Sequence, residues 1–152
     1  MVFSPDGANL TATTAANDVD STTAVLRTCR TADFTEAWAL PLGPDPVTGL
    51  AISPDGRILA TGDGEQIRFR DPANGEVLHD FGTPHPSVIR DLVFSPDGRT
   101  QASDTVDDPA VRLWNVADGG LPTTAAGLAA PPNDAAHQRG CGCPIGRGGW
   151  FR

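Results

Sequence analysis

The sequence lacks lysine and tyrosine altogether, and its 152 residues include only three cysteines. An odd count, with Cys29 far from the other two, does not provide the paired bridges that stabilise small secreted domains. No apolar run approaches the ~20 residues that span a bilayer, and the first residues lack the basic segment and apolar stretch of a signal peptide. We therefore expect a cytoplasmic protein that does not contact membranes.

Basic charge is also scarce. The 11 basic residues are all arginines, spread from Arg27 to Arg152 without a cluster, against 19 acidic residues, which gives a formal net charge of -8. A nucleic-acid surface needs a concentrated basic patch, so nucleic acid is excluded as an expected partner. The acidic balance favours the basic face of a protein partner. Arginine without lysine, beside abundant alanine, glycine and proline, indicates a GC-rich bacterial genome.

Helical periodicity is absent, and aromatic residues make up only 6% of the chain. Glycine and proline are plentiful instead, with 17 and 14 copies. Frequent turns with short strands between them are typical of an all-β protein. The length fits one domain with a core of its own.

One tetrapeptide, Ser-Pro-Asp-Gly, occurs three times and organises the whole chain. Its copies begin at Ser4, Ser53 and Ser95, so they are 49 and 42 residues apart. Proline presets φ and Asp-Gly supplies a tight turn, which predicts a hairpin at each copy. A period of ~40 to 45 residues accommodates four short strands and their turns, which is one blade of a β-propeller. The longer first spacing predicts an expanded polar loop over residues 15–23.

The strands expected in the second and third copies alternate apolar and polar residues or carry β-branched ones. Pro122 restricts the last segment to an outer edge, because proline cannot donate to a ladder. The predicted segments, in chain order, are 47–52, 58–61, 66–71 and 77–81, then 88–94, 99–103, 110–115 and 121–125. In the less regular first copy the expected strands begin near Met1 and continue through 9–14, 24–29 and 36–42.

These repeats divide the chain into four parts. Residues 1–43 form an irregular, N-truncated first blade, residues 44–83 the second blade and residues 84–126 the third. Residues 127–152 are rich in glycine, proline and alanine and cannot bury enough apolar surface to offset the entropy of ordering. The predicted fold is an all-β propeller fragment of about three four-stranded antiparallel blades with a disordered C-terminal tail.

The stretch from His85 to Val116 resembles the WD-repeat (tryptophan-aspartate repeat) β-propeller family. Its histidine, serine, aspartate and tryptophan stand in the relative spacing of that family. The resemblance implies a structural relay of hydrogen bonds from Trp114 through Ser103 and His85 to Asp108. The set leaves no buried polar group unpaired, because indole only donates, hydroxyl and imidazole do both, and carboxylate accepts. Ile67 to Asp71 and Val111 to Asn115 favour this family over other propellers that carry the same turn.

The second copy departs from that pattern. Thr61 fits the hydroxyl position, but the tryptophan position holds Arg70, and no histidine lies between Pro41 and Pro46. The aspartate position falls at Gly64, beside Asp63. We therefore expect a weaker lock on strand register in the second blade.

The pattern of these residues does not favour a catalytic site or a metal site. A serine, a histidine and an aspartate could suggest nucleophilic catalysis, but the implied order ties Ser103 to an indole and exposes no nucleophile beside a base. Cys141 and Cys143 with His137 are too few and too loosely placed for a zinc site. The acidic turns lack the spacing of a calcium loop. No catalytic, cofactor or metal residue is predicted, and the protein is not expected to be an enzyme.

The predicted function is a non-catalytic scaffold module for protein interaction, with contacts from the loops at one rim. Two alternatives stay open: a C-terminal sensor or regulatory piece of a bacterial signalling NTPase or Ser/Thr kinase, and a non-functional truncated remnant. Three blades are fewer than the four to eight that usually close a propeller, so the missing blades are expected from a longer chain or another copy. The candidate rim residues are Asp63, Glu65, His85, Asp104 and Asp107.

Overall fold

The three Ser-Pro-Asp-Gly turns have one common geometry in the computed structural model. In each, the serine Oγ donates to the aspartate Oδ1 at 2.5 to 2.6 Å, and the same Oδ1 accepts the backbone N–H two residues later at 3.0 to 3.1 Å. The glycine has φ between 68° and 72°, a left-handed conformation that costs glycine little. The carboxylate therefore fixes the turn, and the two strands leave it antiparallel.

The structure describes residues 1–15, 23–43, 47–81, 85–108, 110–117 and 124–125, and these contain strands and turns without helix. The strands are β1 (Val2–Phe3), β2 (Asn9–Ala15), β3 (Ala24–Arg30), β4 (Glu36–Pro41), β5 (Val47–Ile52), β6 (Leu59–Asp63), β7 (Gln66–Arg70), β8 (Val77–Asp80), β9 (Ile89–Phe94), β10 (Thr100–Thr105), β11 (Val111–Asn115) and β12 (Thr124–Ala125). No described helix is long and apolar enough to cross a membrane.

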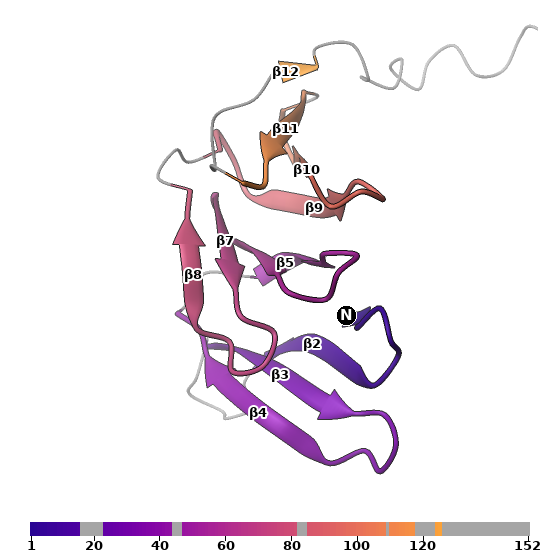
Figure 1. The fold of residues 1–152 in the computed structure, drawn as a ribbon. Coiled ribbons are helices and arrows are strands. Elements are labelled where there is room, and N and C mark those ends of the chain that lie inside the picture. The colour runs from indigo at the N-terminus through magenta and orange to yellow at the C-terminus, as the bar shows by residue number, and fades with distance from the viewer. Residues whose placement is uncertain (16–22, 44–46, 82–84, 109, 118–123, 126–152) are drawn as a thin grey trace, which may run out of the picture.

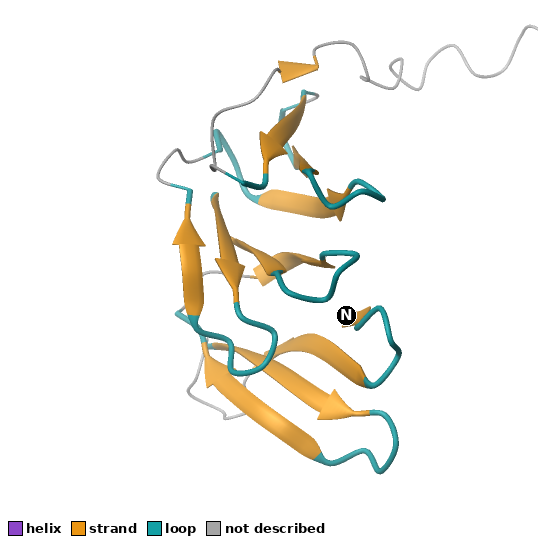
Figure 2. Ribbon diagram, in the orientation of Figure 1, coloured by secondary structure: helices purple, strands orange, loops and turns teal. Residues whose placement is uncertain are grey.

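Each run of four strands forms its own antiparallel sheet, in the orders β1-β2-β3-β4, β5-β6-β7-β8 and β9-β10-β11-β12. The sheets stack face to face, with the second between the other two (Figure 1). Figure 2 shows the same stack as strands joined by loops. Consecutive strands lie side by side in every sheet, so the predicted all-β fold of three four-stranded blades is confirmed.

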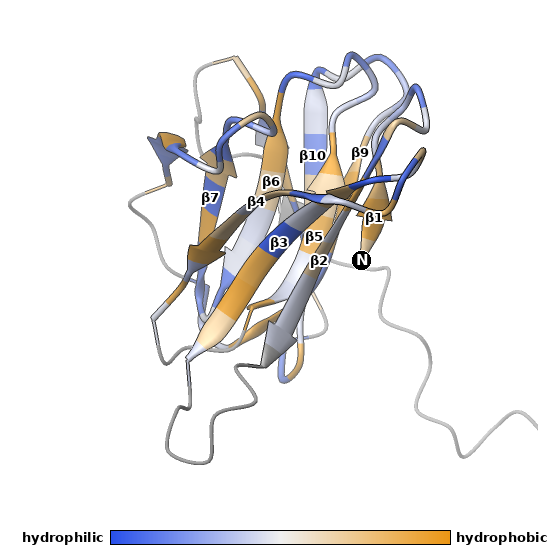
Figure 3. Cartoon of the chain, turned by 90° about the horizontal axis from the view of Figure 1, so that it is seen from below, coloured by the Kyte–Doolittle hydropathy of each residue, from blue (hydrophilic) through white to orange (hydrophobic). Residues whose placement is uncertain are grey.

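Two apolar clusters fill the two spaces between sheets. One lies between the first and second sheets and is built around Leu26, Val47 and Leu59. The other lies between the second and third sheets and is built around Ile67, Phe69, Phe81, Ile89, Leu92 and Trp114. Figure 3 shows hydrophobic residues concentrated on the strands, whereas the turns at one end are largely hydrophilic. The second sheet is covered on both faces, which explains why every residue of β6 is buried.

Glycines let the second and third sheets approach closely. A Cβ built on Gly62 would lie 2.8 Å from Ile89 Cγ2, and one built on Gly49 would lie 2.9 Å from Leu92 Cγ. The Thr48 hydroxyl also donates to the Ile89 carbonyl between the two sheets. Small residues in β5 and β6 therefore set the distance at which β9 packs.

Several predicted boundaries shift by one or two residues. The second strand of the middle blade begins at Leu59 and continues to Asp63, and its counterpart in the third blade continues to Thr105. Both strands run beyond the predicted ends because their last residues pair with the neighbouring strand of the same sheet. The expanded loop predicted over residues 15–23 falls mainly on residues 16–22, outside the described part. The predicted tail, with His137, Cys141 and Cys143, also lies outside it.

Candidate functional site

The third blade contains the first two links of the hydrogen-bond relay that the resemblance implies. The Trp114 indole Nε1 donates to Ser103 Oγ at 2.7 Å, and Ser103 Oγ lies 3.1 Å from His85 Nε2. All three side chains are buried, with exposed fractions of 1 to 3%. The relay ties β11 to β10 and to the segment that enters β9.

The last link differs from the predicted one, because Arg112 lies between His85 and Asp108. Arg112 Nη1 is 2.9 Å from His85 Nδ1, and its Nη2 is 3.6 Å from Asp108 Oδ2. Ser103 and Arg112 are paired across β10 and β11, which brings the guanidinium to the imidazole. Asp108 Oδ1 accepts the Ala110 N–H instead. The predicted direct bond from His85 to Asp108 is therefore replaced by a bridge through arginine.

The bridge fixes the tautomer of His85. A guanidinium only donates, so His85 Nδ1 accepts from Arg112, and Nε2–H then donates to Ser103 Oγ. Ser103 thus accepts two hydrogen bonds, from the indole and the imidazole. Burial, followed by the Arg112 charge, lowers the pKa of His85 to about 4, against a smaller opposing effect of Asp108. Ser103 is consequently a buried double acceptor beside a neutral imidazole, a structural arrangement that presents no accessible nucleophile.

The second blade has a charged cluster in the equivalent place. Arg70 Nε donates to Thr61 Oγ1 at 3.1 Å, and its Nη2 lies 2.7 Å from Asp63 Oδ2. Arg68 Nη1 meets the same oxygen at 2.6 Å. Arg70 and Asp63 are 4% and 8% exposed. The guanidinium of Arg70 thus takes the place of the indole. The sequence shows this replacement, but it does not predict that Asp63 is the buried carboxylate partner of Arg70.

The candidate rim residues gather at one end of the second and third sheets. The His85 N–H donates to the Glu65 carbonyl at 2.7 Å, and the Ile89 N–H donates to the Gly64 carbonyl at 2.9 Å. The Asp107 N–H donates to Ser87 Oγ at 3.2 Å. Three separate turns, at residues 63–66, 85–88 and 105–108, therefore form one continuous surface, which we call the acidic rim.

The candidate residues differ in accessibility. Glu65 and Asp107 are exposed, and Asp104 is half-buried and forms an ion pair with Arg90. His85 and Asp63 are buried in the relay and in the arginine cluster, so neither presents its side chain to a partner. The prediction from the sequence did not include Val106, which lies between Asp104 and Asp107 in the chain and is 60% exposed. A shallow hollow of about 270 Å³ lies beside it and is lined by Pro86, Ser87, Asp107 and Asp108.

Among the described residues, no group of three or more histidine, cysteine, aspartate or glutamate side chains is arranged to hold a metal ion. In the polar clusters of the second and third blades, the side chains form hydrogen bonds and ion pairs with one another instead. Their position is the same in both blades, at the ends of β6 and β10. Stacked four-stranded antiparallel sheets that begin with the same turn sequence, with a buried polar cluster in the second and third repeats, define the class of β-propeller blades.

Known proteins support this assignment. Residues 40–71 and 75–115 match the family model described as WD domain, G-beta repeat. Over those segments the chain matches WD40 repeats.

The curated relatives are much longer proteins. Transducin beta-like protein 2 of Mus musculus is 37% identical over 59% of this chain and 19% of its own length. Apoptotic protease-activating factor 1 of Homo sapiens is 36% identical over 45% of this chain and 6% of its own. The uncharacterized WD repeat-containing protein sll1491 of Synechocystis is 36% identical over 51% of this chain and 22% of its own.

Solved structures show the same architecture. The structure of U3-55K covers 83% of this chain with a TM-score of 0.65 and 25% identity, and 38% of that protein is matched. The RRP9 WD40 repeats cover 81% with a TM-score of 0.64, also at 25% identity, and 36% of that chain is matched. The chain thus spans well under half the length of these relatives.

Proposed function

We propose that this chain is a non-catalytic protein-interaction module and that its partner binds the acidic rim. The single observation that carries the proposal is the joining of three turns from two blades by hydrogen bonds of their backbone N–H groups, with exposed acidic side chains and an exposed valine on these turns. WD40 propellers are typically protein-interaction scaffolds, which supports the assignment. A fold alone does not define function, so the proposal depends on the rim itself.

The chemistry of the rim specifies the partner. Val106 offers an apolar contact, and Glu65 and Asp107 provide exposed carboxylates on the same rim. Interfaces commonly combine an apolar centre with a polar border that gives specificity and speeds association. The partner is therefore a protein with a basic surface that also carries an apolar side chain.

The test compares capture by the wild-type chain with capture by a Glu65→Ala, Val106→Ala, Asp107→Ala variant in an extract of the source cells. We expect the variant to lose the specific partner identified by mass spectrometry. A matched control, Asp33→Ala with Glu76→Ala, removes two exposed acidic residues in turns at the other end of the sheets. Equal capture by the rim variant and the wild type would contradict the proposal.

We also propose that further blades, from a longer chain or another copy, pack on the outer sheets. Phe3 of the first sheet is 61% exposed and Val93 of the third is 55% exposed, and blade packing would cover such residues. Size measurement of the purified chain and translation of the neighbouring DNA test this. The bacterial origin and cytoplasmic location stay predictions, to be checked by the gene and by cell fractionation.

A further inference from the structure

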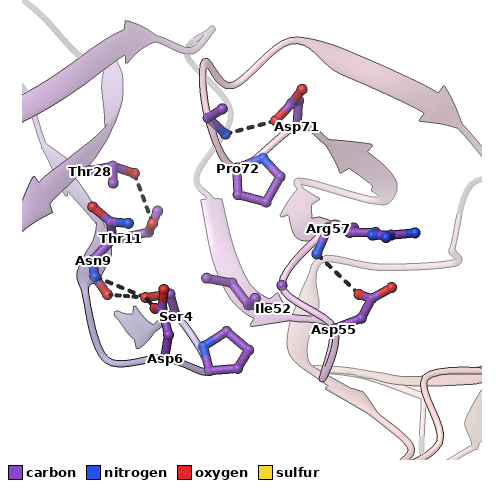
Figure 4. A pocket seen from close by; sticks show the side chains of 13 residues that line it. Ser4, Asp6, Asn9, Thr11, Thr28, Ile52, Asp55, Arg57, Asp71 and Pro72 are labelled. Carbon is purple, nitrogen blue, oxygen red and sulfur yellow. Dashed lines mark hydrogen bonds between the residues drawn. The ribbon is translucent and has the colours of Figure 1, made fainter.

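The Ser-Pro-Asp-Gly turns of neighbouring sheets contact one another in the same way at both interfaces of the stack. A Cβ built on Gly56 would lie 3.6 Å from Pro5 Cδ of the preceding turn, and one built on Gly98 would lie 3.6 Å from Pro54 Cδ. Figure 4 shows the first two of these turns side by side, where the first sheet meets the second. Each interface therefore places the proline of one turn on the glycine of the next.

The two ends of the stack keep the unmatched halves of this repeated contact. A Cβ built on Gly7 of the first turn would meet no atom of the described residues within 4 Å, so no proline covers this glycine. Pro96 belongs to the third turn, and the sequence contains no fourth Ser-Pro-Asp-Gly for it to cover. We call the outward side of each outer sheet its free face. The free face of the third sheet thus carries the half of the contact that the free face of the first sheet lacks.

The strands next to these turns repeat one arrangement as well. Between the second and third sheets, the ring centroids of Phe69 and Phe94 lie 5.8 Å apart. Phe3 precedes the first turn as Phe94 precedes the third, and Phe3 is 61% exposed. Leu113 holds the register position of Phe69 and shares the free face of the third sheet with Val93, which is 55% exposed. A third sheet placed on the first sheet would therefore bring Leu113 against Phe3 and cover Val93.

An exposed phenylalanine at the end of the first sheet is a second sign of a missing neighbour. The β3–β4 and β7–β8 turns are both closed by a backbone N–H that donates to the carbonyl oxygen five residues later, at 2.9 and 2.8 Å. Phe34 and Gly75 stand directly before the residue that accepts, with φ of 58° and 78°. The left-handed conformation is unfavourable for phenylalanine, and the side chain is 84% exposed, so it adds little packing within the chain. The ring of Phe34 is therefore available to another molecule.

The position of Gly75 shows what kind of surface faces Phe34. A Cβ built on Gly75 would lie 2.9 Å from Trp38 Cζ3 and 3.3 Å from Leu40 Cδ2, both on the outer strand of the preceding sheet. The equivalent contact of Phe34 is thus the outer strand of a sheet packed on the free face of the first sheet. In β12, the outer strand of the third sheet, Ala125 holds the register position of Leu40. Alanine is the smaller residue, so the third sheet suits a phenyl ring at this contact better than the first sheet does.

The other end of the third sheet is less suited to close packing. Asp91 and Asp104 stand on its free face at the positions of the two glycines that let the second and third sheets approach closely. Asp104 also forms an ion pair with Arg90 on this face. Charged groups favour contact with water. We therefore place the contact with another sheet at the end of the strands that carries the Ser-Pro-Asp-Gly turns.

We propose that the third sheet of one copy of this chain packs on the first sheet of a second copy, head to tail. The inference rests on the proposed packing of further blades and names a second copy as their source. Pro96 of one copy then covers Gly7 of the other. The same packing brings Leu113 to Phe3 and lays the ring of Phe34 against β12. Two copies with three sheets each supply six, within the four to eight that usually close a propeller.

Sedimentation velocity of the purified chain between about 1 and 100 µM tests the association. We expect particles of two or more copies, with a dissociation constant of about 1 to 10 µM. Phe3→Glu and Val93→Glu each place a carboxylate in the contact, so each is expected to weaken association at least about 100-fold. The matched control is Val77→Glu, because Val77 is 49% exposed on the outer strand of the second sheet, which has no free face.

A mixture of the two variants distinguishes head-to-tail packing from other arrangements. The Phe3→Glu copy keeps an intact third sheet, and the Val93→Glu copy keeps an intact first sheet. The mixture should therefore associate although neither variant does so alone, which also shows that both are folded. Phe34→Gly keeps the left-handed turn and removes the ring, and we expect it to associate about tenfold more weakly than the wild type.

The proposal is overturned if the wild-type chain stays a monomer at about 100 µM, as it would if a longer chain supplied the missing blades. Association of Phe3→Glu alone as tight as that of the wild type, no association in the mixture, or unchanged association of Phe34→Gly would also overturn it. A Glu65→Ala, Asp107→Ala variant should associate as the wild type does. Failure of the rim proposal is thereby distinguishable from failure of this one.

Discussion

Arg70 Nη2 lies 2.7 Å from Asp63 Oδ2 inside the second blade, and both side chains are less than a tenth exposed. In the third blade the equivalent strand position holds Trp114. At this position one repeat thus has an arginine in a buried ion pair, and the next has an indole in a neutral hydrogen bond with Ser103. The two kinds of cluster should respond differently to mutation.

Loss of the buried carboxylate should strongly destabilise the second blade. Asp63→Asn leaves the Arg70 guanidinium buried without its counter-charge, and removal of one partner from a buried pair costs about 3 to 5 kcal/mol. Urea denaturation measures the change in free energy of unfolding. The control is Asp80→Asn, whose exposed pair with Arg68 should contribute less than about 1 kcal/mol. Similar losses in both variants would contradict the assignment of Asp63 as the buried partner.

Trp114→Ala should destabilise the third blade by about 3 to 5 kcal/mol, because it leaves a cavity and removes the indole donor from Ser103. Denaturant unfolding followed by circular dichroism provides the measurement. Trp114→Phe separates the two causes, since it retains most of the volume and loses only the hydrogen bond. A loss below about 1 kcal/mol for the alanine variant would show that the indole is not packed as described.

The free energy of unfolding should fall as the pH is lowered from about 6.5 toward about 4. The pKa of His85 is about 4 in the folded chain and 6.5 as an unperturbed group, so the unfolded state binds the proton first. The contribution of neutral His85 is therefore complete above pH 6.5 and is lost as the pH falls through this window. Denaturation at several pH values should show a shallower slope for His85→Gln than for the wild type. Identical slopes would show that His85 titrates normally.

Gly62→Ala should destabilise the contact between the second and third sheets by about 1 to 3 kcal/mol, because the new Cβ would lie 2.8 Å from Ile89 Cγ2. Gly43→Ala is the matched control, since a Cβ there meets no atom within 4 Å. Thermal unfolding of both variants gives the comparison. Equal melting temperatures would show that β9 can move away from β6 without cost.

The sequence was sufficient for the architecture because turns depend on local residues. The Ser-Pro-Asp-Gly turns and the spacing between them predict four strands per blade, and the structure confirms the arrangement. The hydrogen bond from Trp114 to Ser103 follows from the resemblance to WD repeats, because that resemblance implies the register of the two strands. These features need no information about contacts between distant segments.

The polar details could not be predicted, because they depend on which side chains face one another across paired strands. Arg112 lies between His85 and Asp108 only through its pairing with Ser103, a register that spacing alone does not give. The burial of Asp63 likewise depends on the packing of the first sheet against the second. The contact between Pro5 and Gly56 depends on how two blades pack, which becomes visible only once the sheets are stacked.

The sandwiched position of the second sheet has a consequence for local opening. Its strands β6 and β7 have neighbours on both faces, whereas each outer sheet has one face without a neighbour among the described residues. Fluctuations that expose backbone amides should therefore begin at the outer sheets. In native-state hydrogen exchange, the amides of Ala60 and Ile67 should be the last to acquire deuterium, and their rates should report the opening of the whole stack.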